Sequence, residues 1–477
     1  MKESSLALLT DLYQLTMAQG YYLLGMKDRW SCFHLFFRKK PFGGEYAIFA
    51  GLEPFLEFLE NFSFSREDLD YLSSLESLDG SKMFAQEFLV YLSDFRFSCD
   101  LFSVKEGSVI FPNEPYIRAE GKLLECQLLE TPLLNYFNFS TLIATKASRI
   151  KQAVKDDVFV EFGLRRAQGI NGGLTASRSA FIGGADSTSN VLAGKMYDIP
   201  VSGTQAHSWI MAHSSEEEAF ENFAKVSPHN CAFLIDTYNT VEGAKKAIEI
   251  AKKLEIKEVP VRAHRLDSGD MIALSQIVRT LLDENGLSHI KIMATNELDE
   301  ELIENFKEKG AKIDIWGVGT HLVTARSQPA LDGVYKLSAI QDERGVIQKK
   351  LKKSDTPEKT TNPGKLQVRR YFSSKEAIYD VIYDEMSGIC KDFFLDPNGQ
   401  SNPIDQKANW LDLLASVVKN GKRVNNPIST GEIKKYKNDQ IKKFNKQLFS
   451  LKNPKKFIVG IDPRLQKEKD TIIKFLD

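Results

Sequence analysis

The middle of the chain, from about residue 144 to residue 320, alternates short apolar runs with amphipathic segments. The apolar runs are rich in β-branched and aromatic residues, which is typical of buried strands. The segments between them repeat apolar residues at helical spacing, as Ala244, Ala247 and Ala251 do. This alternation recurs about every 25 to 35 residues, which is typical of βαβ units with parallel strands. It predicts a parallel sheet or barrel of the (β/α) kind, with helices that include residues 241–254 and 271–282, and strands at residues 158–162, 199–201, 231–235, 259–263, 290–294 and 313–317.

The two ends of the chain lack this alternation. Residues 1–140 are rich in phenylalanine, and we expect most of these rings to lie in a core. Residues 107–120 alternate apolar and polar side chains around two prolines, which indicates short antiparallel strands and a mixed α+β domain. Beyond residue 348 the pattern weakens. There we expect an exposed loop at residues 349–365, and a solvated helical face rather than a nucleic-acid patch at residues 419–456.

A chain of 477 residues is long enough for two or three domains. We predict an N-terminal α+β domain at residues 1–140, an α/β barrel domain at residues 141–347 and a C-terminal segment at residues 348–477. Hydrophobic residues make up 42% of the chain and charged residues 27%, which is ordinary for a globular protein and excludes a disordered or low-complexity chain.

Charge and cysteine usage exclude several kinds of partner and site. The 63 Lys and Arg residues balance 64 Asp and Glu residues, so the net charge of −1 gives no general attraction for nucleic acid or a membrane surface. No apolar run reaches the roughly 18 residues of a membrane span, and no export signal is visible. The five cysteines are scattered without a CxxC motif, so no disulfide framework or structural zinc site is expected, and no residue is assigned as a metal ligand. A cytoplasmic protein is predicted.

Polar residues follow six consecutive predicted strands. In parallel α/β folds, ligands bind beyond the carboxyl ends of the strands, because loops and helix N-termini converge there with unpaired backbone N–H groups. A single polar end is explained equally well as the N-cap of the following helix. Six together favour a binding site. In chain order the ends carry Arg165 and Arg166; Thr204 and His207; Asp236 and Thr237; Arg265, Asp267 and Asp270; residues 295–297; and Gly319 and Thr320.

These residue types suit an anionic substrate. Gly319 lets backbone N–H groups approach a phosphate closely, and Thr320 adds a hydroxyl donor. Arg165, Arg166 and Arg265 supply guanidinium groups suited to bidentate pairing with a carboxylate or phosphate. Surface ion pairing remains an alternative for any single arginine.

Two aspartates and one histidine complete the candidate chemistry. Asp267 and Asp270 could hold Mg²⁺ through oxygen, although Asp270 could instead cap the helix expected from residue 271. His207 lies in a loop among hydroxyl residues and not on an apolar helical face. Its imidazole could act as an acid, a base or a phosphoryl-accepting nucleophile. Together these features predict a phosphorylated substrate and a group-transfer reaction.

Seven short motifs occur in order along the chain: TDLYQ at residues 10–14, FRKKPFGG at 37–44, LETPLL at 129–134, GLRRAQG at 163–169, GTQAHS at 203–208, RLDSGD at 265–270 and GVGT at 317–320. In combination they closely resemble the motifs of nicotinate phosphoribosyltransferases. The resemblance is strong from about residue 8 to residue 364 and poor beyond it.

The resemblance implies a reaction and a fold. Nicotinate and phosphoribosyl pyrophosphate would give nicotinate mononucleotide and pyrophosphate, coupled to ATP hydrolysis, in NAD salvage by the Preiss–Handler pathway. Mg²⁺ would be the cofactor and ATP a co-substrate. The fold of this family is an irregular (β/α) barrel of the type II phosphoribosyltransferase kind, beside an α+β domain formed from N- and C-terminal segments. The C-terminal segment would therefore pack partly with the N-terminal domain.

The resemblance also assigns roles to single residues. His207 matches the histidine that ATP phosphorylates, and Tyr13 would reach the site of a neighbouring subunit in a homodimer. The resemblance implies that Tyr13, Thr204 and Arg265 contact nicotinate, and that Gly319 and Thr320 belong to the phosphoribosyl phosphate site. Arg165 and Asp267 lie in matching motifs and complete the substrate-binding positions.

Two other functions stay open at this point. A nicotinamide phosphoribosyltransferase is one, because Glu161 at a strand end offers a carboxylate that could accept an amide N–H bond. The other is a non-catalytic paralogue that binds metabolites. Intact His207 and Arg265 argue against the second.

Overall fold

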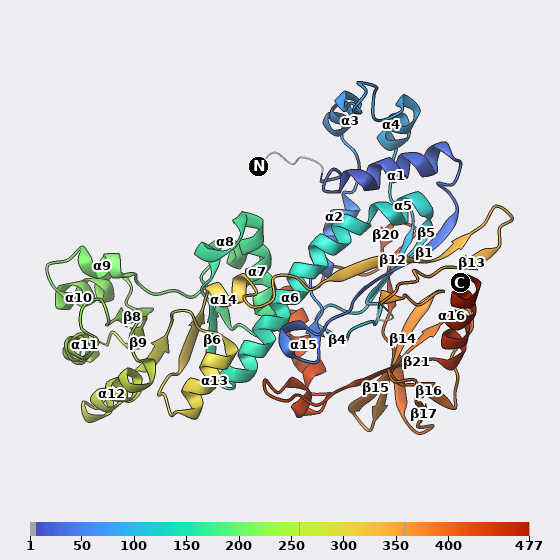
Figure 1. Ribbon diagram of the computed structural model, residues 1–477. Helices are drawn as coiled ribbons and strands as arrows, with labels where there is room; N and C mark the ends of the chain where they lie inside the picture. Colours follow the sequence, from blue (N-terminus) through green and yellow to red (C-terminus); the bar gives the residue numbers. More distant parts are fainter. Residues whose placement is uncertain (1–5, 257, 357–358, 477) are drawn as a thin grey trace.

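The computed structural model describes residues 6–256, 258–356 and 359–476. Figure 1 shows a lobe built on the parallel sheet, on the left, and a larger body of antiparallel strands on the right, with a small group of helices above that body. The long helix α6 (Glu130–Val154) runs diagonally between the two. None of the helices in the described ranges is long and apolar enough to cross a bilayer.

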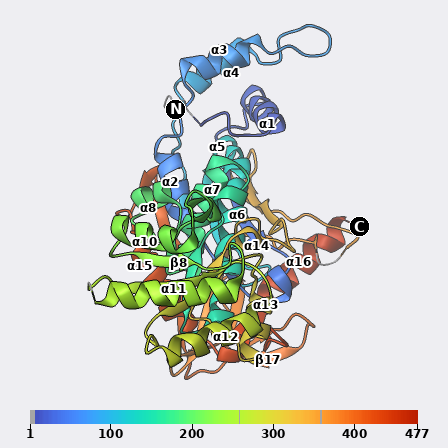
Figure 2. The same cartoon turned by 90° about the vertical axis from the view of Figure 1, so that its left-hand side faces the viewer.

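The left-hand lobe contains a six-stranded parallel sheet in the order β7-β6-β11-β10-β9-β8. It ends in two edge strands and so forms half of a barrel, which confirms the predicted fold class. Helices α10, α11 and α12 cover its outer side (Figure 2). The strands are β6 (Val158–Glu161), β7 (Ser187–Thr188), β8 (Cys231–Leu234), β9 (Val261–Leu266), β10 (Lys291–Ala294) and β11 (Ile315–Val318); the helices are α7 (Gly169–Gly183), α8 (Val191–Tyr197), α9 (His207–Met211), α10 (Glu216–Val226), α11 (Thr240–Glu255), α12 (Met271–Glu284), α13 (Glu300–Glu308) and α14 (Thr320–Val323), with a 3₁₀ turn η2 (Leu164–Arg166).

Two of the predicted strands differ from the observed ones. Residues 199–201 form no strand, and only Val201 makes an isolated parallel bridge to Thr188. Pro200 has no N–H to donate, which explains why the pairing stops there. Strand β9 begins and ends later than predicted, so Arg265 lies inside the strand rather than in the loop after it.

Helix α6 connects the two bodies through buried polar contacts. Glu300, at the start of α13, accepts hydrogen bonds or ion pairs from Lys146 at 2.6 Å and from Arg149 at 3.0 Å, and all three side chains are buried. Helix α7 packs closely on α6 at Gly183, where a Cβ atom would lie 2.3 Å from the Ala144 carbonyl oxygen. These contacts fix the parallel sheet against the rest of the molecule.

The right-hand body contains two large sheets with strands from distant parts of the sequence. One is antiparallel throughout, in the order β13-β12-β1-β5-β3-β19-β20, and so combines the start, middle and end of the chain. The other has the order β17-β16-β21-β15-β14-β18. The strands are β1 (Trp30–Phe37), β3 (Asp100–Ser103), β5 (Ile117–Lys122), β12 (Gly333–Gln341), β13 (Ile347–Lys349), β19 (Ala415–Lys419) and β20 (Lys422–Arg423) in the first sheet, and β14 (Leu366–Ser373), β15 (Glu376–Asp384), β16 (Phe393–Leu395), β17 (Ser401–Pro403), β18 (Asn409–Asp412) and β21 (Ile458–Ile461) in the second.

The sharing of sheets between both ends of the chain agrees with the α+β part of the predicted fold. The domain boundaries at residues 140 and 347 stay predictions, and α6 runs across the first of them. The remaining elements are α1 (Leu12–Leu23), η1 (Pro41–Gly43), α2 (Leu52–Glu60), α3 (Arg66–Ser74), α4 (Gln86–Ser93), α5 (Leu123–Leu128), α15 (Thr430–Ile441), η4 (Lys446–Phe449), α16 (Pro463–Leu476) and a small ribbon of β2 (Ala47–Ile48) with β4 (Val109–Ile110).

The predicted solvated face at residues 419–456 is wrong at one lysine. Lys437 on α15 is 2% exposed, because its face of the helix packs on the molecule instead of facing water. Burial lowers the pKa of Lys437 to about 7, and the nearby cations Lys434 and Lys151 lower it further, while Asp186 offsets them only in part.

Lys437→Met is therefore expected to stabilise the protein. Below pH 7 the lysine is protonated in both the folded and the unfolded state, so the full cost of burying the charge applies; the cost fades as the pH rises from 7 towards the unfolded pKa of 10.5. We expect a gain of about 2 to 4 kcal/mol in unfolding free energy at pH 6 and almost none at pH 10. Urea denaturation at both pH values measures it, with Lys435→Met, an exposed site on the same helix, as control. An equal gain at both pH values would contradict the charge explanation.

Candidate active site

His207 is the first residue of α9, directly after the loop that follows Val201. Its Nδ1 lies 3.2 Å from the hydroxyl of Thr237, and its Nε2 lies 3.5 Å from Asp267 Oδ2. The side chain is 41% exposed, so it can be reached by a substrate. Thr237 follows β8, and Asp267 follows β9. Residues that come after three of the predicted strands therefore lie together here.

Arg265 uses four of its five N–H donors within the protein. Nε donates to Thr295 Oγ1 at 3.0 Å, and Nη1 donates to Thr204 Oγ1 and to the Gln205 carbonyl, both at 3.1 Å. Nη2 donates to Asp267 Oδ1 at 2.9 Å. One N–H of the guanidinium remains for a ligand, since an arginine has five. The predicted residues Thr204, Arg265 and Asp267 thus form one network with His207.

Asp267 is the centre of this network. Burial by itself would raise the pKa of its carboxyl, but the Arg265 guanidinium, the Thr295 hydroxyl and His207 outweigh burial and hold the pKa below the usual value. The carboxylate therefore stays ionised at neutral pH. It can accept a hydrogen bond from the Nε2–H group of His207 and so fix the orientation of the imidazole.

Asp236 also belongs to the site, although nothing in its sequence pattern distinguishes it from the other polar residues at strand ends. It follows β8, is buried, and through Oδ2 accepts hydrogen bonds from the Asp267 backbone and the Ser268 hydroxyl, both at 2.7 Å. Within the described residues, its Oδ1 is buried without a hydrogen-bond partner. Asp236 and Asp267 follow neighbouring strands, and Mg²⁺ commonly binds one or two protein carboxylates together with substrate phosphates, so these two residues could hold it.

Asp270 is not part of this oxygen set. Its Oδ1 caps α12 by accepting the N–H groups of Ile272 at 3.0 Å and Ala273 at 3.1 Å. The alternative of a helix cap is therefore the correct one. Among the residues that the structure describes, no cluster of three or more His, Cys, Asp or Glu side chains could hold a metal by itself.

The glycine-rich end of β11 packs against the end of β6. A Cβ atom on Gly319 would lie 3.1 Å from the Phe162 carbonyl, and one on Gly163 would collide with Val323 at 2.2 Å. Thr320 begins α14 and donates its hydroxyl to Glu297 at 3.1 Å. The glycines therefore allow two strand-end loops to approach each other, next to an exposed helix start.

The loop after β10 adopts a backbone conformation that costs energy. Asn296 and Glu297 both have positive φ angles, of 88° and 39°. Glu297 binds Arg326 at 2.9 Å and His321 at 3.2 Å in addition to Thr320. Strain of this kind is concentrated at functional sites, where it positions side chains. It was not visible in the sequence.

Arg165 and Arg166 lie on the exposed turn η2, at the same edge of the sheet. No carboxylate of the described chain pairs with either of them, so the alternative of a surface ion pair finds no support there. Both guanidinium groups are available to an anion.

Glu161 is not accessible to an amide substrate. It is fully buried, and its carboxylate accepts hydrogen bonds from the Gly163 backbone, from Ser177 at 2.8 Å and from Thr188 at 2.5 Å. The observation that kept nicotinamide open as a substrate is thereby removed. Glu161 instead holds the ends of β6 and β7 together.

Tyr13 is not brought to this network within one chain. It lies on α1, in the upper right part of Figure 1, whereas His207 begins α9 at the far left. Its side chain is 49% exposed and lines a hollow of about 360 Å³ with Asp11, Thr131 and Asn138. A shared site with a second copy of the chain is the arrangement that would use it.

Comparison with known proteins agrees with the motifs. The model of the nicotinate phosphoribosyltransferase N-terminal domain matches residues 8–138, that of the nicotinate phosphoribosyltransferase family matches residues 158–376, and that of the nicotinate phosphoribosyltransferase C-terminal domain matches residues 365–469. The last match includes the tail in which the motifs were weak.

Curated relatives and solved structures cover most of the chain. Nicotinate phosphoribosyltransferase of Bacillus subtilis is 45% identical over 389 residues, which is 80% of this chain and 78% of that protein. The human enzyme of the same name is 34% identical over 426 residues, 77% of each chain. The crystal structure of human nicotinic acid phosphoribosyltransferase superposes with a TM-score of 0.84 at 28% identity, covering 97% of this chain and 99% of that one. A nicotinate-nucleotide pyrophosphorylase from Pyrococcus furiosus, with a TM-score of 0.72 at 21% identity over 93% of this chain and 97% of that one, shares the fold. This chain therefore belongs to the nicotinate phosphoribosyltransferase family.

Proposed function

We propose that this protein transfers the phosphoribosyl group of phosphoribosyl pyrophosphate to nicotinate, giving nicotinate mononucleotide and pyrophosphate in NAD salvage, with coupled hydrolysis of ATP. One observation carries the proposal: an exposed histidine, His207, shares the carboxylate of Asp267 with Arg265 at the ends of neighbouring parallel strands. The relatives named above support the choice of nicotinate as substrate.

His207 is proposed to carry the phosphoryl group of ATP. The ionised Asp267 accepts Nε2–H, which leaves a lone pair on Nδ1, the nitrogen that faces the Thr237 hydroxyl. Nδ1 attacks the γ-phosphorus, the bond to the bridging oxygen breaks, and ADP leaves. A phosphorylated side chain adds about −1.5 to −2 of charge by analogy with other phospho residues, and this charge beside the site could order loops that hold the substrates.

Arg265 is proposed to bind the carboxylate of nicotinate through its unspent N–H, with the Thr204 hydroxyl beside it. A charge-assisted hydrogen bond of this kind favours the acid over the amide, because nicotinamide has no charge to pair. The neighbouring Asp267 compensates the arginine when no substrate is bound. The guanidinium of Arg265 would therefore already be oriented when nicotinate binds.

The phosphate groups are proposed to lie over the exposed cations and helix start at the same edge. Gly319 and Thr320 would bind the 5′-phosphate through backbone N–H groups and a hydroxyl, and Arg165 would contact the pyrophosphate. Asp236 and Asp267 would hold Mg²⁺, which supplies positive charge to the departing pyrophosphate when bound. As the ribose carbon develops oxocarbenium character, these fixed donors stabilise the charge that builds on the leaving group.

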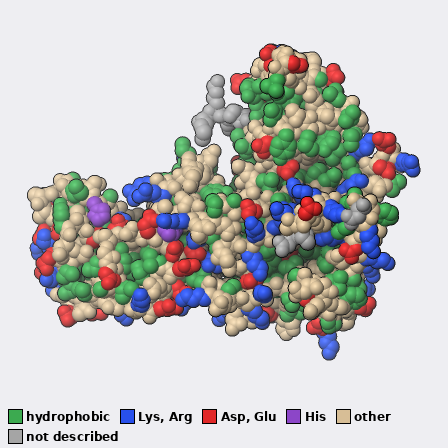
Figure 3. Space-filling view, viewed as in Figure 1, with side chains coloured by type: hydrophobic (Ala, Val, Ile, Leu, Met, Phe, Trp, Pro, Cys, Tyr) green, Lys and Arg blue, Asp and Glu red, His purple; other side chains and the backbone are tan. Residues whose placement is uncertain are grey.

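We further propose a homodimer with shared active sites. Helix α1 exposes the apolar side chains of Leu12, Tyr13 and Met17, and Leu9 just before the helix is exposed as well; the four are 36% to 50% exposed. Figure 3 shows hydrophobic side chains on the helical end of the molecule and on the lobe across from it, with a hollow in the outline between them. Burying such side chains against a second copy would bring Tyr13 to the partner's nicotinate.

Mixing two impaired variants tests the shared site. Tyr13→Ala and His207→Ala each damage both sites of their own homodimer. The two variants are mixed, unfolded and refolded together, so that about half of the dimers are hybrids. Each hybrid contains one intact site of two, so the mixture should recover up to about a quarter of the wild-type activity. Activity is measured as nicotinate mononucleotide formed. A mixture with no more activity than the separate variants would contradict a site built from two subunits.

A product assay tests the proposed reaction itself. Nicotinate and nicotinamide are offered separately with phosphoribosyl pyrophosphate, each with and without ATP. We expect nicotinate mononucleotide, faster with ATP, and little or no product from nicotinamide. Equal rates with the two pyridines would contradict the role of Arg265. No product from either, in a folded protein, would favour a metabolite-binding paralogue.

The cellular location is proposed to be the cytoplasm. All five cysteines are free and buried, which suits a reducing compartment.

A further inference from the structure

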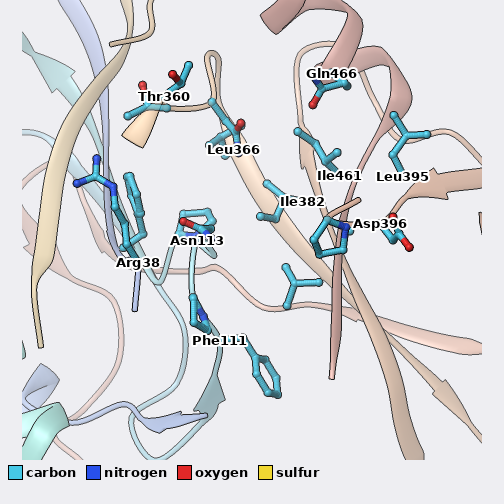
Figure 4. A pocket seen from close by; sticks show the side chains of 18 of the residues that line it. Arg38, Phe111, Asn113, Thr360, Leu366, Ile382, Leu395, Asp396, Ile461 and Gln466 are labelled. Atoms are coloured by element: carbon cyan, nitrogen blue, oxygen red, sulfur yellow. The ribbon is translucent and has the colours of Figure 1, made fainter. Parts of the chain in front are cut away.

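A large cavity lies between the two large sheets of the right-hand body, far from His207. Its volume is about 1080 Å³, at the upper end of what is usual for small-molecule sites. Strands β1 and β12 form one wall, and β14, β15, β21 and helix α16 form the other. Figure 4 shows Arg38 and Asn113 on one side of it and Asp396, Ile461 and Gln466 on the other. The proposed reaction does not use this space, although the motif at residues 37–44 contributes Arg38 and Lys40 to its lining.

Positive charge predominates around the cavity. Of the described residues, two carboxylates line it: Glu45, which pairs with a lining lysine, and Asp396, whose Oδ1 already accepts two backbone N–H groups at 2.9 Å. Among the described residues, three of the lining cations form no ion pair with a carboxylate. The five lining cations are Lys40 and Lys336, which are paired, and Arg38, Lys456 and Lys469, which are not.

Two of these unpaired cations are also partly desolvated. Lys469 donates to Asn362 Oδ1 at 3.0 Å, and Arg38 donates to the Lys359 carbonyl at 3.4 Å, so each has only a neutral partner. Burial lowers the pKa of both side chains, in Lys469 against a small opposing effect of Asp470. A bound anion would supply the opposite charge that the described residues do not place beside these two side chains.

The cavity also has an aromatic wall. Phe111 and Phe457 stack on each other with ring centroids 4.3 Å apart and planes 12° apart. Phe36 lies on the opposite side, beneath the guanidinium of Arg38 at 5.5 Å. Apolar walls with a few cations are typical of sites for ligands that join a ring to a charged group.

His34 provides an independent sign of a missing partner. It lines the cavity and is 2% exposed. Its Nε2 accepts the backbone N–H of Leu366 at 3.1 Å, so in the neutral ring the proton lies on Nδ1. In the part of the chain that the structure describes, that Nδ1–H has no hydrogen-bond partner although it is buried. Buried donors are nearly always satisfied, and a ligand in the cavity would satisfy this one.

We propose that the cavity between the two sheets binds an organic phosphate that carries an aromatic ring, of the size of a nucleotide. The ring lies against the phenylalanine walls, and the phosphate lies near Lys456 and Lys469. The site is separate from the one at His207, and its occupancy does not depend on the proposed reaction.

Two charge-matched pairs of lysines allow a controlled binding test. Lys456 and Lys469 line the cavity, whereas their near neighbours Lys455 and Lys467 do not; Lys455, Lys456 and Lys467 are all exposed, so the pairs differ mainly in whether they line the cavity. Binding of AMP is measured by titration calorimetry for wild type, for the double variant Lys456→Gln/Lys469→Gln and for the control Lys455→Gln/Lys467→Gln. We expect the first double variant to lose at least about tenfold in affinity at low salt, and the control to change less than about twofold.

Photolabelling with 8-azido-AMP locates the bound ring. We expect label in residues 457–461, which form part of one wall, and its loss in the Lys456→Gln/Lys469→Gln variant, provided that the melting temperature of this variant matches wild type. Adenosine and inorganic phosphate should each bind at least tenfold more weakly than AMP. Label only near His207, equal losses in the two double variants, or phosphate binding as tightly as AMP would each overturn the proposal.

Discussion

His207→Ala is expected to abolish the ATP hydrolysis that accompanies formation of nicotinate mononucleotide. The variant lacks the nitrogen that accepts the phosphoryl group, so the step is removed rather than slowed. Loss of a covalent nucleophile typically costs on the order of 10³-fold or more. ADP and nicotinate mononucleotide are measured in the same reaction, and their ratio is compared with that of wild type. ATP should no longer change the rate of product formation.

The exposed His229, in the loop before β8, provides the matched control. Its side chain has no hydrogen bond or ion pair to the described residues, so His229→Ala should retain the ratio of ADP to product. Unchanged ATP turnover in His207→Ala would remove the assigned role. A mass increase of one phosphate on the peptide that contains His207, seen after incubation with ATP in wild type only, would support it.

Arg265→Ala is expected to raise the KM for nicotinate on the order of 10²-fold. The estimate assumes loss of one buried, charge-assisted hydrogen bond worth about 3 kcal/mol. The variant also leaves the carboxylate of Asp267 without its principal counterion, so a lower kcat is expected together with the higher KM. Steady-state kinetics with nicotinate and with phosphoribosyl pyrophosphate separate the two effects.

Two controls distinguish recognition of the carboxylate from general damage. Arg262→Ala removes the same side chain from an exposed position on β9 and should leave both KM values unchanged. Arg265→Lys keeps the charge but loses the fork of donors that joins Thr204, Thr295 and Asp267, and should recover only part of the affinity. An equal loss towards nicotinamide in Arg265→Ala would contradict the assignment.

The parallel sheet was predictable because its signal is local. Each buried strand is a short apolar run, and each connecting helix has its own periodicity, so β6, β8 and β10 lie within one or two residues of their expected places. The rule that ligands bind at carboxyl ends of parallel strands then predicts that His207, Arg265 and Asp267 lie together. Exact strand ends were harder, as the extension of β9 through Arg265 shows.

Features that depend on tertiary packing were not predictable in this way. Lys437 belongs to a lysine-rich segment, and only the packing of α15 shows that it is buried. For Asp236, only the folded structure shows which carboxylate oxygen is hydrogen-bonded and which is not. For Glu161, the hydrogen bonds come from Ser177 and Thr188, which are distant in the sequence. The cavity between the sheets combines parts of the chain that are more than 400 residues apart, such as His34 and Lys469. Periodicity carries no information about such pairs.

A crystal structure with nicotinate and a non-reactive analogue of phosphoribosyl pyrophosphate tests the central claim most directly. We expect the nicotinate carboxylate within hydrogen-bonding distance of Arg265, and the sugar phosphate at the Gly319–Thr320 turn, in the same pocket as the imidazole of His207. A structure with both molecules bound away from the ends of β8, β9 and β10 would contradict the account.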